Sequence, residues 1–273
     1  MLRLALLSAR GRLGTFAGAL VALIASSALV MAGAMPFQSA LRTHPPVERY
    51  AGAAAVVTGQ QIAGADHDVP LGERARVSSD LAPRLAAVPG VRAAIADVSV
   101  PARLGGRAVA AHGWESAPLT PYVLTAGRPP VRADEVVAGF RARVGARVRI
   151  ASTEAARTVT VVGVARPRHP VRQQTAIFLT DGEAARLAGY PARPPRVDAI
   201  GVLAGPGFDA ARLHEAAHGA VVLTGDGRGR AEYPELQAAR TTLIAVTAAF
   251  CSSEEKTGLA TRRRRSSLSS NIT

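Results

Sequence analysis

The feature that most constrains this chain is a long uncharged stretch near its N-terminus. Residues 13–41 contain no Asp, Glu, Lys or Arg, and a helix of that length exceeds the hydrocarbon core of a bilayer, which is about 30 Å thick. Arg3, Arg10 and Arg12 precede the stretch, and basic residues flanking a membrane helix favour the cytoplasmic side. We therefore expect a basic cytoplasmic lead over residues 1–12, a transmembrane helix over 13–41, and location in the cell membrane.

A cleaved signal peptide is the alternative for this segment, because Ala32-Gly33-Ala34 resembles a cleavage site. Its apolar run is longer than the roughly 7 to 15 residues of a usual signal-peptide core, which favours a retained anchor. Gly14, Gly18, Ala22 and Ser26 recur at every fourth position and predict a face on which a second membrane helix could pack closely. The competing interpretation is that Ala-rich composition makes small residues common everywhere.

Composition narrows the classes of function. The net charge of +13 would suit nucleic acid, but the arginines are scattered and aromatic residues make up only 4% of the chain, so we expect no nucleic-acid partner. The single cysteine, Cys251, excludes an internal disulfide framework and a Cys-based zinc site. The sequence has no P-loop motif, so the chain does not itself hydrolyse ATP by that route. We expect no cofactor and no catalytic residue.

Residues 45–235 predict an α+β extracytoplasmic domain. Apolar strands alternate with short helices at both of its ends, in the order strand, helix, strand. The first unit comprises residues 51–59, 80–88 and 91–100, and the second comprises 197–205, 209–218 and 220–225. In both units an Asp lies ten residues before a Gly (Asp80 and Gly90, Asp209 and Gly219), placed to cap the first turn of the helix and to end it. This pattern indicates a weak internal duplication.

The segment between the two units is rich in strands. Residues 144–150 and 157–165 alternate as paired strands around a polar turn. Residues 174–180 then lead into a short helix that ends at Gly189, and Thr180 with Glu183 has the spacing of a capping box. The sequence therefore predicts an inserted lobe built mainly of strands.

One motif suggests an enzyme. His214, Glu215 and His218 spell H-E-x-x-H, in which two histidines hold zinc and the Glu acts as general base. The expected helix has only about ten residues, however, and His218 is its last position. Its apolar face comprises Ala210, Leu213 and Ala217, which leaves the motif on the solvated side. We interpret the motif as part of a surface helix, and keep a membrane-anchored zinc metallopeptidase as an alternative.

Residues 1 to about 250 resemble the start of an ABC-transporter permease of the FtsX/MacB type, of the actinobacterial branch. The resemblance rests on the lead and apolar stretch "RGRLGTFAGALVALIASSALVMAGA", then "LTAGRPPVRADEVV", "VGARVRIASTEAARTVTVVGVARP" and "ELQAARTTLIAVTAAF". It implies a core domain of two porter-like β-α-β units with an inserted lobe. It also implies a separate ATPase subunit, a second permease copy, and a role in exporting lipid, lipoprotein or peptide, or in transmitting motion. It supplies no catalytic residues.

The C-terminal part departs from that family. Residues 236–250 begin a second membrane helix, but after Phe250 the composition changes abruptly, and residues 251–273 hold the only Cys, Lys and Asn of the chain. The apolar piece 241–251 spans only about 16 Å as a helix. A frameshift or truncated reading frame explains this best, and the product would then not transport alone. The alternative is a native basic tail on a stand-alone anchored binding or scaffold domain, with Arg262 to Arg265 on anionic lipid.

Overall fold

The computed structural model describes residues 17–28, 31, 45–63, 69–70, 74–172 and 175–233, which fall into two separate bodies, residues 1–43 and 44–273. In the first body, residues 17–28 are helical and include Gly18, Ala22 and Ser26, whereas Gly14 lies outside the described residues. Within the described ranges no helix is both long and apolar enough to cross a membrane. The packing face on this helix remains a prediction, as do the helix over 13–41 and the segments 236–250 and 251–273.

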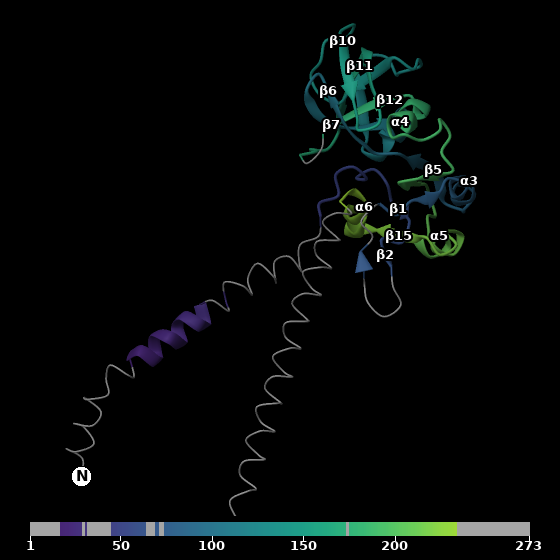
Figure 1. Ribbon diagram of the computed structural model, residues 1–273. Helices are drawn as coiled ribbons and strands as arrows, with labels where there is room; N and C mark the ends of the chain where they lie inside the picture. The colour runs from purple at the N-terminus through teal and green to yellow at the C-terminus, as the bar shows by residue number, and fades with distance from the viewer. Residues whose placement is uncertain are drawn as a thin grey trace, which may run out of the picture. The chain divides into compact units, whose positions relative to one another are not determined.

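The second body contains a four-stranded sheet made from both ends of the domain (Figure 1). Its strand order is β15-β1-β14-β5, and every neighbouring pair is antiparallel. Strands β1 and β5 are therefore parallel to each other with β14 between them, and β14 and β15 are parallel with β1 between them. Helix α3 connects the first pair and α5 the second, so two split β-α-β units interleave in one sheet. The bounds are β1 Ala55–Thr58, α3 Leu81–Ala86, β5 Val91–Asp97, β14 Ala199–Ala204, α5 Ala210–Ala216 and β15 Val221–Thr224.

Apolar side chains hold the two helices on this sheet. Leu85 of α3 and Leu213 of α5 are fully buried in the same cluster as Ile200 and Val202 of β14. The opposite side of the sheet packs against a second cluster that includes Tyr50, Val56 and Leu119. Complete burial of a side chain of this size contributes roughly 1.5 to 3 kcal/mol, so these contacts fix the sheet between its helices and the segments on its other side.

A strand-rich lobe is inserted between β5 and β14 and lies above the four-stranded sheet in Figure 1. Its strand order is β10-β6-β7-β12-β9-β11-β8. Because β10 also pairs with β11, six of these strands close into a ring, and β8 pairs with β11 outside it. Closure leaves few free strand edges, and Val100, Val136 and Ile150 fill the interior. The bounds are β6 Val100–Leu104, β7 Arg107–Gly113, β8 Tyr122–Gly127, β9 Glu135–Ala138, β10 Arg147–Ala151, β11 Ala156–Pro167, β12 Ala176–Leu179 and α4 Asp181–Leu187.

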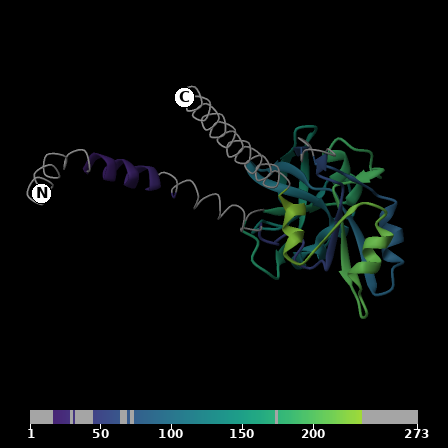
Figure 2. The same cartoon turned by 90° about the horizontal axis from the view of Figure 1, so that it is seen from below.

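Short elements complete the domain. Two further strand pairs and two 3-10 helices link the larger parts, and Figure 2 shows the α6 turn at the end of the described chain. The bounds are β2 Ile62–Ala63 with β3 Val69–Pro70, β4 Val77–Ser78 with β13 Arg196–Val197, η1 Trp114–Leu119, η2 Gly225–Arg228 and α6 Gly229–Glu232. Of these, η1 and α6 take part in the candidate site.

The helix caps are only partly those predicted. Asp209 accepts a hydrogen bond from the backbone N–H of Ala211 at 2.9 Å, as an N-cap should. The prediction for Asp80 is wrong, because its backbone is already helical and its side chain makes no capping bond. The capping box of Thr180 with Glu183 is also wrong, since the Glu183 carboxylate is engaged by Arg157 and Arg186 instead.

The Gly-Arg-x-Pro and Asp-Glu-Val-Val stretches form a structural clamp. Arg128 donates from both terminal nitrogens to the carboxylate of Glu135, which also accepts the backbone N–H groups of Val131 and Arg132 at 2.8 and 3.1 Å. These bonds lower the pKa of Glu135 to about 2, with Arg128 the largest cause. The turn needs glycine at position 127, where φ is +75° and a Cβ would collide with the carbonyl oxygen of Val162.

Candidate functional site

A buried carboxylate lies where the lobe meets the four-stranded sheet. Asp97, the last residue of β5, is fully buried. The guanidinium of Arg49 donates to its Oδ1 at 2.9 Å, the Tyr50 hydroxyl donates to its Oδ2 at 3.0 Å, and Nδ1 of His112 lies 3.1 Å from Oδ1. Arg49 and Tyr50 belong to the segment that enters the domain, and His112 belongs to β7 of the lobe. One side chain therefore joins three separate parts of the fold, and we call this group the Asp97 cluster.

Arg49 extends the cluster to the 3-10 helix η1. Its terminal nitrogens donate to the backbone oxygen and the Oγ of Ser116 at 3.1 and 2.7 Å, and to the Oγ1 of Thr120 at 2.5 Å. Only 5% of Arg49 is exposed. Burying a guanidinium is costly unless its charge is compensated and its N–H groups find partners. The terminal nitrogens of Arg49 have these partners, whereas its Nε has none among the described residues.

The ionisation states of the cluster follow from its burial. Burial alone would raise the pKa of the Asp97 carboxyl, but Arg49 and His112 outweigh it and hold that pKa well below its usual range. Burial, followed by the charge of Arg49, lowers the pKa of His112, which favours a neutral ring with its proton on Nδ1, facing the carboxylate. Nε2 of His112 has no hydrogen-bond partner among the described residues. The cluster is thus one ion pair with a neutral imidazole.

The entry and the exit of the domain are tied to each other beside this cluster. The buried carboxylate of Glu232, in α6, accepts the backbone N–H of Glu48 at 2.9 Å and that of Tyr50 at 3.0 Å. A Cβ at position 229 would collide with the carbonyl oxygen of Pro45, so only glycine allows α6 to lie this close. The first and last described segments of the domain therefore run side by side.

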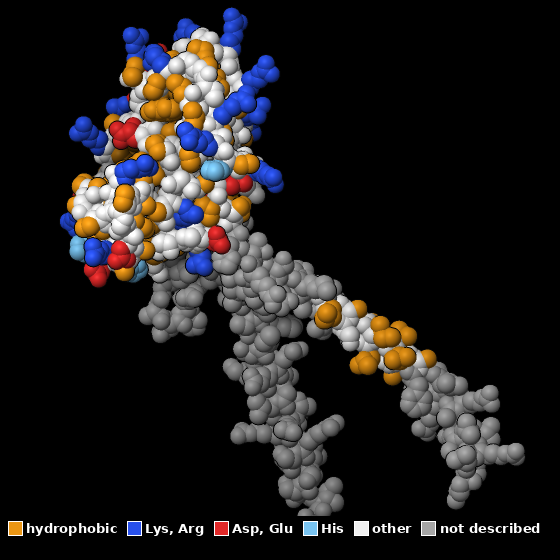
Figure 3. Space-filling model, turned by 180° about the vertical axis from the view of Figure 1, so that it is seen from behind, with side chains coloured by type: hydrophobic (Ala, Val, Ile, Leu, Met, Phe, Trp, Pro, Cys, Tyr) orange, Lys and Arg blue, Asp and Glu red, His pale blue; other side chains and the backbone are white. Residues whose placement is uncertain are grey.

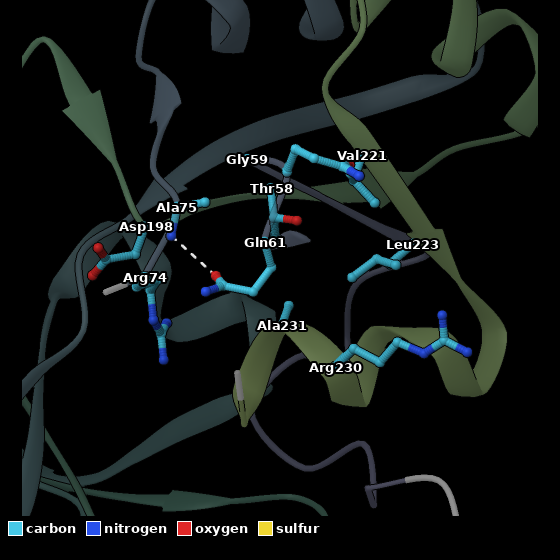
Figure 4. Close-up of a pocket in the computed structure, with 11 residues that line it drawn as sticks. Thr58, Gly59, Gln61, Arg74, Ala75, Asp198, Val221, Leu223, Arg230 and Ala231 are labelled. Carbon is cyan, nitrogen blue, oxygen red and sulfur yellow. Dashed lines mark hydrogen bonds between the residues drawn. The ribbon is translucent and has the colours of Figure 1, made fainter. Parts of the chain in front are cut away.

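A cavity of about 220 Å³ opens between β1, β15 and α6 (Figure 4). Leu223 and Ala231 line its apolar side, and Arg74 and Arg230 lie toward its two ends. The side-chain oxygen of Gln61 accepts the backbone N–H of Ala75 at 3.0 Å, which fixes the wall. Asp198 also lines this cavity, so its polar lining carries charges of both signs.

A second cavity, of about 550 Å³, shares Arg74 and Asp198 with the first and reaches the lobe. Arg76 is held in place by the ring of Tyr190, 4.0 Å from its guanidinium carbon, and by Asp198, whose Oδ1 is 3.8 Å from its Nε. Burial raises the pKa of Asp198. The backbone N–H of Ser99, which donates to its carboxylate at 2.8 Å, lowers that pKa but does not outweigh burial. Two arginines, Arg74 and Arg76, and two acidic residues, Asp198 and Glu232, line this cavity together with small apolar residues.

The H-E-x-x-H residues take no part in the Asp97 cluster, although His218 lines a further cavity, of about 670 Å³, together with Arg74 and Arg76. Helix α5 ends at Ala216, so His218 is outside it, with a φ of +46°. His214, Glu215 and His218 are all exposed, and no three His, Cys, Asp or Glu residues of the described ranges are grouped as metal ligands. Leu213 and Ala217 are buried as predicted, whereas Ala210 is exposed and does not belong to the apolar face. The peptidase alternative is not favoured.

Comparisons with known proteins give structural relatives only. No protein-family model and no curated protein matches the sequence. Solved structures do match. The periplasmic region of MacB from Actinobacillus actinomycetemcomitans aligns at 12% identity and a TM-score of 0.44, over 65% of this chain and 92% of that one. The extracellular domain of the noncanonic ABC-type transporter YknZ from Gram-positive bacteria aligns at 15% identity and a TM-score of 0.38, over 55% and 89% of the two chains.

Proposed function

We propose that this chain supplies the first membrane helix and the extracytoplasmic domain of an FtsX/MacB-like ABC transporter permease, and that the domain passes motion between membrane segments. The observation that carries the proposal is the tie between the entering and leaving segments of the domain. A domain inserted between two neighbouring membrane helices needs its two ends side by side, and Glu232 holds them so through the amides of Glu48 and Tyr50.

The Asp97 cluster supports the mechanical part of the proposal. Arg49 belongs to the entering segment, and it donates hydrogen bonds both to Asp97 of the four-stranded sheet and to Ser116 of η1. A displacement of the entering segment would therefore be transmitted to the lobe through buried, charge-assisted hydrogen bonds, which are the strong ones. The role we assign to these residues is positioning, and no enzyme activity is part of the proposal.

The proposal includes partners that follow from the family resemblance. They are a separate ATPase subunit, a second permease copy and the membrane lipid around the helix. Because residues 1–273 contain no P-loop motif, the proposal assigns ATP hydrolysis to the separate ATPase subunit. The transported molecule would be a lipid, a lipoprotein or a peptide, and we propose that this chain alone does not complete transport.

Reading the DNA beyond codon 250 in all three frames tests the permease assignment. The proposal expects another frame to continue as an apolar helix and further membrane helices. A tagged chain with the continuous frame restored should then co-purify with an ATPase that carries G-x-x-x-x-G-K-[ST]. If every frame stops or stays polar, the stand-alone anchored domain replaces the permease, and the partners above fall with it.

A further inference from the structure

The outer face of the lobe carries a row of arginines that its strand register places together. Ala151 of β10 pairs with Arg103 of β6, and Arg103 pairs with Ala108 of β7. Paired residues share a face of a sheet, and alternate residues of a strand return to that face. Arg147 and Arg149 therefore lie on the same face as Arg103. All three are exposed.

The other face of the same strands is the core of the lobe, which confirms the assignment of faces. Ala102, Leu104, Val109 and Ile150 alternate with the residues named above and are all buried. The arginines are thus directed outward by the apolar pattern of the strands. Figure 3 shows many basic and few acidic side chains over the upper lobe, in the view from behind.

The row continues downward into the 550 Å³ cavity. Pro101 pairs with Ala110, both lie on the arginine face, and both line that cavity together with Ala108. Arg74 and Arg76 form the lower wall. The groove therefore has a floor of small apolar residues and arginines at both ends, and we call it the arginine groove.

Two acidic residues lie at the lower end of the groove, and one of them, Asp198, pairs with Arg76 at 3.8 Å. Both are buried, and they also accept the backbone amides of Ser99 and of Glu48. Arg103 donates one bond to the carbonyl of Gly106 at 2.8 Å, which leaves its remaining N–H groups for a ligand. Among the described residues, Arg147 and Arg149 form no ion pair within the domain.

The spacing of the arginines matches one kind of ligand. Side chains two residues apart on a strand are separated by roughly 6.8 Å, and so are alternate side chains of an extended peptide. From Pro101 to the level of Arg147 the face covers about 20 Å, or roughly six to seven extended residues. The floor of Pro101, Ala108 and Ala110 is low enough for a backbone to lie across it.

We propose that the arginine groove binds an extended acidic segment of a protein partner, with its alternate carboxylates on Arg103, Arg147 and Arg149 and one end in the cavity beside Arg74. Guanidinium groups bind carboxylates with two parallel hydrogen bonds, which gives geometric specificity beyond charge. This inference does not depend on the proposed transport role, because it rests on the strand register of the lobe and on the arginines of the groove.

The test measures binding of a fluorescein-labelled peptide of alternating Glu and Ser, seven residues long, to the full chain in detergent by fluorescence anisotropy. Arg147→Gln with Arg149→Gln should weaken binding at least about tenfold. Arg84→Gln with Arg92→Gln removes the same charge from exposed positions of α3 and β5 and should change binding less than about twofold. Both variants should keep the wild-type thermal unfolding midpoint, because none of the four side chains is buried.

Three outcomes would overturn the inference. They are equal weakening by the two double variants, equal binding of a peptide with Gln in place of Glu, and absence of peptide binding. A further arm uses vesicles of phosphatidylcholine with phosphatidylglycerol. In this arm the detergent is removed from the protein before the vesicles are added. If the protein then binds the vesicles through Arg147 and Arg149 but does not bind the peptide, the surface recognises lipid and the peptide proposal is wrong.

Discussion

Arg49 and Asp97 form an ion pair 2.9 Å long in which 6% of the first side chain and none of the second is exposed. They are 48 residues apart in the sequence, and they join the segment that enters the domain to the end of the strand β5. Because neither charge can be solvated if its partner is removed, loss of either side chain should destabilise the junction between the entering segment and β5.

Asp97→Asn should therefore destabilise the domain by about 3 to 5 kcal/mol, the usual cost of leaving a buried charge without its partner. Chemical denaturation followed by the fluorescence of the single tryptophan, Trp114, measures this, since its ring packs edge-on against Phe178 at 5.6 Å. The exposed Arg84→Met is the matched control and should change stability by less than about 0.5 kcal/mol. If Asp97→Asn also changed stability by less than about 0.5 kcal/mol, the Arg49–Asp97 pair would not be needed to stabilise the domain.

His112 should make the folded state sensitive to mild acid. Its pKa is lowered in the folded state by burial and by Arg49, so the unfolded chain binds a proton first. The contribution of His112 to the free energy of unfolding is then fully present above its unfolded pKa of about 6.5, and it is lost as the pH falls through and below that value. Asp181 has the opposite effect, because burial and Glu115 raise its pKa to about 6, and its folded form takes up the proton more readily.

His112→Asn isolates the contribution of the histidine. Asparagine can still donate to Asp97 but does not titrate, so the difference in unfolding free energy between wild type and variant should shrink or reverse between pH 7.5 and 5. Asp181 is present in both proteins and cancels from that difference. A difference that stays constant over this range would contradict a lowered pKa.

Substitutions at Gly106 and Gly127 allow the cost of backbone strain to be measured separately from the cost of a steric collision. Gly106 and Gly127 have positive φ values of +84° and +75°, but a Cβ at 106 meets open space, whereas one at 127 would strike the carbonyl oxygen of Val162. Gly106→Ala should cost about 1 kcal/mol from conformation alone. Gly127→Ala should cost clearly more, about 3 kcal/mol or above, because the clamp of Arg128 and Glu135 must also move. Equal thermal shifts for the two variants would refute this reading of the turn.

The strands and helices of the domain could be predicted from local sequence patterns. The Asp97 cluster, where the lobe meets the four-stranded sheet, could not. Alternating apolar residues at 157–165 and the mainly apolar stretch 197–205 predict strands by themselves, and β11 and β14 form there. The Asp97 cluster depends instead on contacts between residues 15 to 71 positions apart, and no local period reports such pairs. The one signal was a carboxylate at the end of the otherwise apolar stretch 93–97.

The failed caps have a related cause. Glu183 has the right spacing from Thr180 for a capping box, but Arg157 comes from the neighbouring strand β11 and takes the carboxylate. A charged partner on another element outweighs a local hydrogen bond. The H-E-x-x-H motif shows the opposite case, in which local spacing suggested a site and the end of α5 before His218 removed the shared helix face.

The central claim is that residues 45–233 form an extracytoplasmic domain behind a membrane anchor, and cysteine accessibility in intact cells tests it most directly. Cys251 is replaced by serine, and a single cysteine is placed either at Arg84, exposed on α3, or at Ser8 in the basic lead. The account predicts that a membrane-impermeant maleimide labels position 84 in intact spheroplasts and labels position 8 only after lysis. Labelling of position 8 in intact spheroplasts with protection of position 84 would contradict it.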